Sequence, residues 1–125
     1  MIKMEQPRAS DLITILKTVG FPRQAGKVLT HFIMSENGIK LSAVDIEQRT
    51  RMRQPEVSVG AASLVKMHWL RVTPQKKESK GRPVHLYEIA VERNVVYDWL
   101  AEKLQGKLKE IQLMQQAVAE LKKAK

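Results

Sequence analysis

The stretch LSAVDIEQRTRMRQPEVSVGAASLVKMHWLRVTPQKKESKGRPVHLYEI, residues 41–89, decides the fold. Its first ten residues predict a short helix, and a basic turn follows them. A second helix is expected to begin at Gln54-Pro55-Glu56, because proline is tolerated in the first turn and a glutamate there suits the positive end of the helix dipole. Two extended segments then flank a tip rich in lysine, arginine and glycine. The predicted order is therefore helix, turn, helix and hairpin.

The second helix has two different faces. Val57, Ala61 and Leu64 recur at i, i+4 and i+7, which predicts one apolar stripe of an amphipathic helix. The residues off this stripe are small and uncharged as far as Lys66. A helix that enters a major groove needs such a narrow face, with N-terminal residues that reach base edges. A helix of small residues packed on both sides is the alternative.

Side chains suited to reading bases gather at the start of this helix. Arginine can pair with guanine, glutamine with adenine, and glutamate can accept from cytosine. Arg53, Gln54 and Glu56 offer these groups. The residues of the turn and helix expected to contact DNA are Arg51, Arg53, Gln54, Glu56, Ser58, Val59, Ala62, Ser63 and Lys66.

Positive charge is concentrated in the same stretch. Residues 49–82 contain nine basic and two acidic side chains, a net of +7, whereas the whole chain carries +9. Charge concentrated in this way is expected where phosphates must be neutralised. It coincides with the helix start and the hairpin tip, which favours nucleic acid over an ordinary solvated face. At the tip, lysines that only block edge pairing are the alternative to DNA contact. The tip residues expected to contact DNA are Lys76, Lys77, Lys80 and Arg82.

The stretch resembles the winged helix-turn-helix transcription regulators, in particular the MarR-, ArsR- and TrmB-like proteins of archaea and bacteria. The resemblance rests on residues 41–50 for the first helix, 51–64 for the turn and recognition helix, and the strands within 67–72 and 80–89. It implies a mainly α (α+β) fold with a small three-stranded antiparallel sheet, in which residues 39–41 supply the third strand. Two positions depart from the pattern: Glu47 replaces a small alanine, and Arg51 replaces the glycine of the turn.

Helices are also expected on both sides of this stretch. Upstream, one helix should end at Gly20 and another should run from Pro22 to about Ser35. Downstream of Glu92, side chains at alternating steps of three and four are apolar as far as Leu121, with Lys107 as the one polar position, which predicts a coiled-coil helix. A helix of some 30 residues would be about 45 Å long, too long for one small domain to cover.

The sequence therefore predicts a winged-helix DNA-binding domain over residues 1–90 and a dimerisation helix over residues 91–125. The start of this helix, near Val95, Val96 and Trp99, is expected to pack on the domain, and the remainder is expected to pair with a second copy of the chain. A helix folded back on its own core is the alternative. The expected dimerisation residues are Leu100, Leu104, Leu108, Ile111, Met114, Val118 and Leu121.

The sequence offers little to catalysis or to metal binding. It has no cysteine, and its three histidines, His31, His68 and His85, are scattered without ligand spacing, so neither a metal nor another cofactor is expected. We find no phosphate-binding loop and no paired nucleophile and base, which argues against an enzyme. A cytoplasmic protein is expected, because no stretch approaches 18 apolar residues and the first residues do not form a signal peptide.

Three functions fit these observations. The first is a homodimeric transcription regulator that binds specific sequences of double-stranded DNA. The second is a nucleoid or architectural protein of low sequence specificity, and the third is a winged helix used for protein contacts in the transcription machinery. Whether a small-molecule effector exists stays open: Trp69, Tyr97 and Trp99 are candidates to line such a site, or to be core residues.

Overall fold

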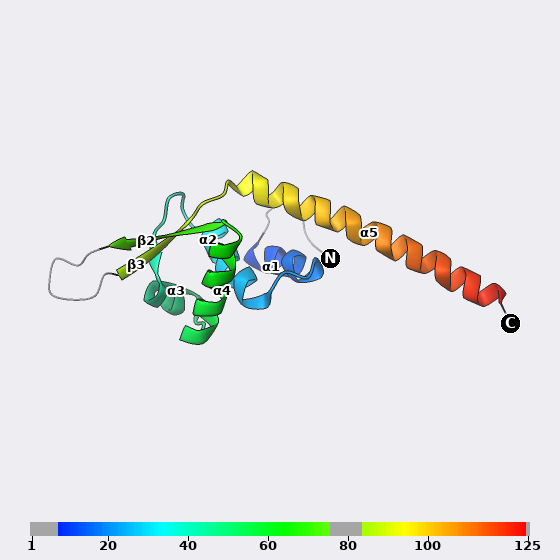
Figure 1. The fold of residues 1–125 in the computed structure, drawn as a ribbon, viewed down its shortest axis with the longest axis horizontal. Coiled ribbons are helices and arrows are strands. Elements are labelled where there is room, and N and C mark those ends of the chain that lie inside the picture. Colours follow the sequence, from blue (N-terminus) through cyan, green and yellow to red (C-terminus); the bar gives the residue numbers. More distant parts are fainter. Residues whose placement is uncertain (1–7, 76–83, 125) are drawn as a thin grey trace.

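A computed structural model describes residues 8–75 and 84–124, and Figure 1 shows its five helices and three strands. In chain order the elements are α1 (Ala9–Thr18), α2 (Arg23–Met34), β1 (Leu41–Ser42), α3 (Ala43–Thr50), α4 (Gln54–Lys66), β2 (Leu70–Gln75), β3 (Val84–Ile89) and α5 (Arg93–Lys123). The first four helices pack together beside the sheet, while most of α5 projects away from them. The predicted fold class, mainly α with a small antiparallel sheet, is confirmed.

The sheet has the strand order β1-β3-β2, and both pairings are antiparallel. β2 and β3 form the predicted hairpin, and Leu41 of β1 pairs with Tyr87 of β3. β2 is an edge strand, which explains why Pro74 is tolerated within it, since an edge leaves one side of the backbone without a ladder partner. The four basic tip residues of the hairpin fall within 76–83, outside the described residues.

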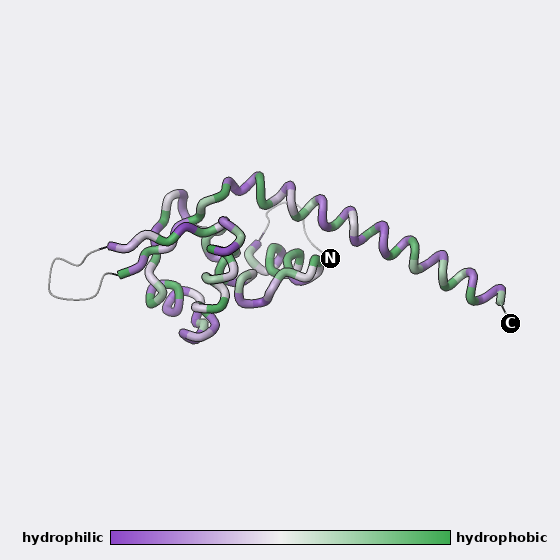
Figure 2. The backbone as a smooth tube through the Cα atoms, viewed as in Figure 1, coloured by the Kyte–Doolittle hydropathy of each residue, from purple (hydrophilic) through white to green (hydrophobic). Residues whose placement is uncertain are grey.

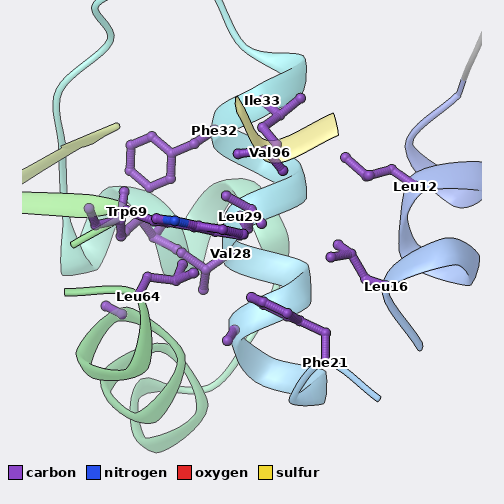
Figure 3. Close-up of a cluster of buried hydrophobic side chains, with 14 of the residues drawn as sticks. Leu12, Leu16, Phe21, Val28, Leu29, Phe32, Ile33, Leu64, Trp69 and Val96 are labelled. Carbon is purple, nitrogen blue, oxygen red and sulfur yellow. The ribbon is translucent and has the colours of Figure 1, made fainter. Parts of the chain in front are cut away.

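The hydrophobic core is built around α2, the central helix of the domain. Val28, Leu29 and Phe32 of this helix are almost fully buried. Figure 3 shows them between side chains from α1, α4, α5 and the segment just before β2. The labelled partners from those elements are Leu12, Leu16, Leu64, Trp69 and Val96. α2 therefore lies against α4 and also meets the start of α5.

The turn between α3 and α4 keeps the conformation that glycine usually makes. Arg51 ends α3 in the left-handed region, with φ 59° and ψ 22°. Its backbone N–H donates to the carbonyl of Glu47 at 2.8 Å, and the next residue, Met52, is buried. Arg51 therefore adopts the turn conformation that glycine usually makes. A residue with a β-carbon is strained in this region, so the conformation costs some free energy.

α4 approaches α2 closely at Gly60. A β-carbon at Gly60 would lie 2.7 Å from the backbone oxygen of Gln24 and 3.0 Å from a methyl group of Val28. Ala61 is also buried on this side, whereas Ala62 is exposed. Gly60 and Ala61 of α4 thus allow close contact with α2.

The beginning of α5 belongs to the domain core, except that Val95, which is predicted from the sequence to pack there, is 49% exposed. Val96 is fully buried, and Leu100 is only 4% exposed, so the assignment of Leu100 to the dimerisation residues is wrong: it packs within its own chain. Arg93 anchors the first turn of α5 to the end of α2. Its guanidinium donates to the carbonyl of Ile33 at 2.8 Å, to that of Ser35 at 2.7 Å, and to the Asn37 side chain.

Beyond Leu100 every side chain of α5 is exposed, and so is that of Ala124, which follows the helix. The helix is therefore not folded back on its own core. In Figure 2 hydrophobic and hydrophilic segments alternate along this projecting part. The exposed apolar side chains of this part include Leu104, Leu108, Ile111, Leu113, Met114, Val118 and Leu121.

Candidate nucleic-acid interface

Helix α4, the predicted recognition helix, divides into a buried and an exposed face, as its sequence predicts. Val57, Gly60, Ala61 and Leu64 are buried against the domain. The outward residues that are exposed are Gln54, Pro55, Ser58, Val59, Ala62 and Lys66. Ser63 is half-buried, and its hydroxyl donates to the backbone carbonyl of Val59 at 3.1 Å. The exposed face is therefore narrow and free of acidic side chains along its centre.

Three exposed arginines lie in or near the turn that precedes α4. Arg49 lies in the last turn of α3, Arg51 in the turn and Arg53 at the N-cap of α4, and all three are exposed. Cations near a helix N-terminus oppose the positive end of the helix dipole, so Arg53 does not stabilise α4 by its charge. An anion placed there would gain from the arginines and from the helix dipole together.

Glu56 has a structural role that the sequence analysis did not assign. Its carboxylate accepts the backbone N–H of Arg53 at 2.9 Å, so it caps the start of α4. The signal was present in the spacing, because a carboxylate at the third helical position commonly reaches back to the N-cap. Among the described residues, Glu56 is thus tied to its own helix, while no hydrogen bond joins the side chains of Gln54 or Ser58 to another of them.

One of the nine basic residues within residues 49–82 forms an ion pair on the hairpin. Arg71 of β2 lies opposite Glu88 of β3, and its Nε donates to the Glu88 carboxylate at 3.3 Å. Glu88 lies outside residues 49–82, so the charge of that segment overstates what is available to phosphates. Both side chains keep some exposure, which makes this cross-strand pair a weak one.

The aromatic residues considered for an effector site lie mostly in the core. The rings of Phe21 and Trp69 are stacked with centroids 5.9 Å apart, and Trp99 meets Trp69 edge-on at 5.2 Å. This trio joins α5 to the domain. Tyr97 is exposed on another side of α5. A separate cleft of about 610 Å³ lies along α1 and α2; its lining residues include Ile13, Leu16, Lys17, Phe21, Arg23 and Lys27.

The histidines occupy three different environments. His31 is half-buried on α2, and burial, with a smaller contribution from the charge of Arg49, lowers its pKa. His68 adopts a positive φ of 64° just after α4, and His85 is exposed on β3. Within residues 8–75 and 84–124, no three His, Asp or Glu side chains gather in a way that suits a metal ion. No helix in this part of the chain combines the length and apolarity needed to span a membrane.

Comparisons with known proteins bear on the fold. No protein-family model matches the chain, and no curated protein matches it. Among solved structures, the chain is similar to a possible transcriptional regulator from Methanosarcina mazei Go1, with a TM-score of 0.60 and 14% identity over 82% of this chain and 83% of that one.

Two further solved structures are similar. One is NadR in complex with 4-hydroxyphenylacetate, with a TM-score of 0.51 and 18% identity over 93% of this chain and 84% of that one. The other is a mutant of MarR from E. coli, with a TM-score of 0.52 and 12% identity over 88% and 84%. Identities this low establish the fold alone: the chain has the winged helix-turn-helix fold of solved transcriptional regulators that include MarR.

Proposed function

We propose that this protein is a homodimeric transcription regulator that binds double-stranded DNA, with α4 in the major groove and the hairpin tip at the backbone or minor groove. The observation that carries the proposal is the exposed face of α4, which is narrow and lacks acidic groups along its centre. The exposed side chains of Arg51 and Arg53 lie at its N-terminal end, and exposed Arg49 lies in the last turn of α3. This arrangement matches what a recognition helix needs, namely cations for phosphates and N-terminal residues within reach of base edges.

The dimer is proposed from the exposed apolar stripe of α5. Its aliphatic side chains, from Leu104 to Leu121, are between 37% and 72% exposed in the single chain. Burying one such side chain stabilises an assembly by roughly 1.5–3 kcal/mol, and the stripe follows the spacing of a coiled coil. Closed assemblies of identical chains are most often two-fold, which would set two recognition helices on one duplex.

Two other functions compete with this one. An architectural DNA-binding protein would share the charge but would show little preference among sequences. The exposed side chains of Gln54 and Ser58 favour base reading, because neither neutralises a phosphate charge. A winged helix used only for protein contacts is disfavoured by the arginines around α4, which suit an anionic partner.

The first test is selection of bound sequences from a random duplex pool at near-physiological salt, followed by titration of the enriched duplex. We expect a pseudo-palindromic site with half-sites about one helical turn apart. Binding should weaken with salt at about −0.9 per phosphate contact, or on the order of −6 to −9 for the dimer. A slope near zero in fluorescence anisotropy would remove DNA as the ligand, and binding without any enriched sequence would favour the architectural function.

The second test separates base contacts from phosphate contacts. Replacing Arg53 or Gln54 with alanine should cost roughly 1–3 kcal/mol on the preferred site and relax the preference at one or two positions. Replacing Lys77 or Lys80 of the hairpin tip should weaken all duplexes similarly and reduce the salt slope by about one. If the Arg53 and Gln54 variants select the same sequence as the parent, α4 is not the reading element.

The third test addresses the dimer. A chain ending after Lys103 keeps Val96, Leu100 and the Lys103 ammonium that lies 5.4 Å from the Trp99 ring centroid, so its core is complete. We expect this fragment to sediment as a folded monomer, and to lose the roughly 10²–10⁴-fold gain in affinity that comes from linking two modules. A full-length chain that sediments as a monomer at tens of micromolar would contradict the dimer.

A further inference from the structure

The outward face of α4 carries an apolar ridge. Pro55, Val59 and Ala62 are spaced i, i+4 and i+7 and are all exposed, so they line up along the helix; we call them the outer ridge. The buried stripe of Val57, Ala61 and Leu64 has the same spacing two residues later, which places it on the opposite side of the helix. The outer ridge therefore points directly away from the domain core.

The centre of the outer ridge is Val59, which is 58% exposed. Neither packing nor helix propensity accounts for a valine there, because the side chain is not buried and a β-branched residue is a poorer helix former than alanine or most polar residues. The hydroxyl of Ser63, one turn further along the helix, is hydrogen-bonded to the backbone carbonyl of Val59. A single exposed valine is ordinary on a protein surface. Its place at the middle of the recognition face is what distinguishes this one.

The surroundings of the outer ridge identify the kind of surface that would cover it. The exposed side chains of Arg51 and Arg53 lie at one end of α4 and that of Lys66 at the other. Phosphates on the two sides of a groove complement such flanking cations, whereas an apolar protein surface does not. Within the major groove only thymine presents a methyl group, and apolar side chains contact it.

We infer that Val59, with Ala62 beside it, reads the 5-methyl groups of thymines, so that the centre of each half-site is rich in A·T pairs. The inference rests on the proposed function, because it assigns a specificity to the same recognition helix. In this arrangement Arg53 and Gln54 contact the flanking bases, and Val59 and Ala62 make apolar contacts with the bases at the centre of the half-site. The chemistry predicted for the partner is thus a duplex whose thymine methyls are accessible in the major groove.

The experiment compares the duplex enriched from a random pool with the same duplex synthesised with deoxyuridine for deoxythymidine. Uracil pairs as thymine does and lacks only the methyl group. Burying one methyl-sized group corresponds to about fourfold in affinity, so loss of one contact in each half-site should weaken binding on the order of tenfold. The salt slope should be the same for both duplexes, because their phosphates are unchanged.

A matched pair of variants assigns the effect to a residue. Val44 on α3 is also 58% exposed, so Val59→Ala and Val44→Ala remove the same atoms from equally exposed helical sites, and alanine endangers neither helix. The penalty of uracil substitution should shrink toward onefold in Val59→Ala and stay at about tenfold in Val44→Ala, as in a double-mutant cycle.

The outcomes separate the inference from the proposed function. If the protein binds no duplex, the proposed function fails and the inference fails with it. If it binds DNA but no sequence is enriched, or uracil costs nothing, DNA binding stands and the reading of thymine methyls is overturned. If uracil costs the same in Val59→Ala as in the parent, another residue reads the methyl groups and the assignment to Val59 is overturned.

Discussion

Replacing Gly60 with alanine tests whether the contact between α4 and α2 positions the recognition helix. The added β-carbon would lie 2.7 Å from the backbone oxygen of Gln24 and 2.8 Å from its carbonyl carbon. Ordinary contacts of this kind begin near 3.4 Å, so the two helix backbones must separate by about 0.7 Å, because no flexible side chain can move aside. Overpacking of this sort costs about 3 kcal/mol, at the upper end of its usual range, and alanine returns about 1 kcal/mol of helix propensity.

We therefore expect Gly60→Ala to lower the free energy of unfolding by about 2 kcal/mol, or Tm by roughly 8 °C for a domain of this size. The matched control is Gly106→Ala in α5, where nothing lies within 4 Å of the added carbon. That variant should keep its stability or gain up to about 1 kcal/mol. Urea unfolding followed by circular dichroism at equal protein concentration measures both. Equal effects of the two substitutions would refute the argument that α4 and α2 meet at Gly60.

Three further predictions concern single interactions. Arg93→Lys should lower stability by about 1–3 kcal/mol in the same urea assay, because lysine cannot reach the three acceptors at the end of α2; unchanged stability would mean that these hydrogen bonds do not hold α5. Burial lowers the pKa of His31 below its ordinary 6.5, so below about pH 6.5 the unfolded chain binds a proton that the folded chain does not. The difference in Tm between the parent and His31→Gln should therefore shift against the parent as the pH drops below about 6.5. Parallel curves of Tm against pH from about pH 5 to 8 would contradict this. Ser42→Ala should cost about 1 kcal/mol in thermal unfolding, since it removes the acceptor of the Asp45 N–H, and a neutral result would rule out the cap.

The elements that could be predicted from the sequence are those with a local signal. Pro22 precedes α2, Ser42 caps α3 with a hydrogen bond from Asp45, and Pro55 stands in the first turn of α4, so all three helix starts follow from chemistry within one turn. The edge position of β2 was predictable in the same way from Pro74.

Contacts between distant segments could not be predicted so well. The heptad spacing of α5 is continuous through Leu100, yet that side chain faces the core of its own chain, because periodicity gives a face of the helix and not the identity of its partner. Arg93 has no local signal at all: its acceptors come from the end of α2, some 60 positions earlier in the chain. The role of Glu56 was visible in its spacing, but its charge and place at the recognition helix favoured base contact instead.

α5 runs without interruption from the buried Val96 to the exposed Leu121, so one rigid helix carries both the core contacts and the stripe proposed to pair with a second copy. The direction in which that stripe faces, relative to α4, is therefore set by the number of residues between the core contacts of α5 and the stripe. One residue inserted after Lys103 would turn the stripe by about 100° and swing the recognition helix out of register with its partner's, whereas seven inserted residues would restore the phase to within about 20°. Changes in the length of this helix that preserve the pairing should accordingly be of about seven or eleven residues, and not of one or two.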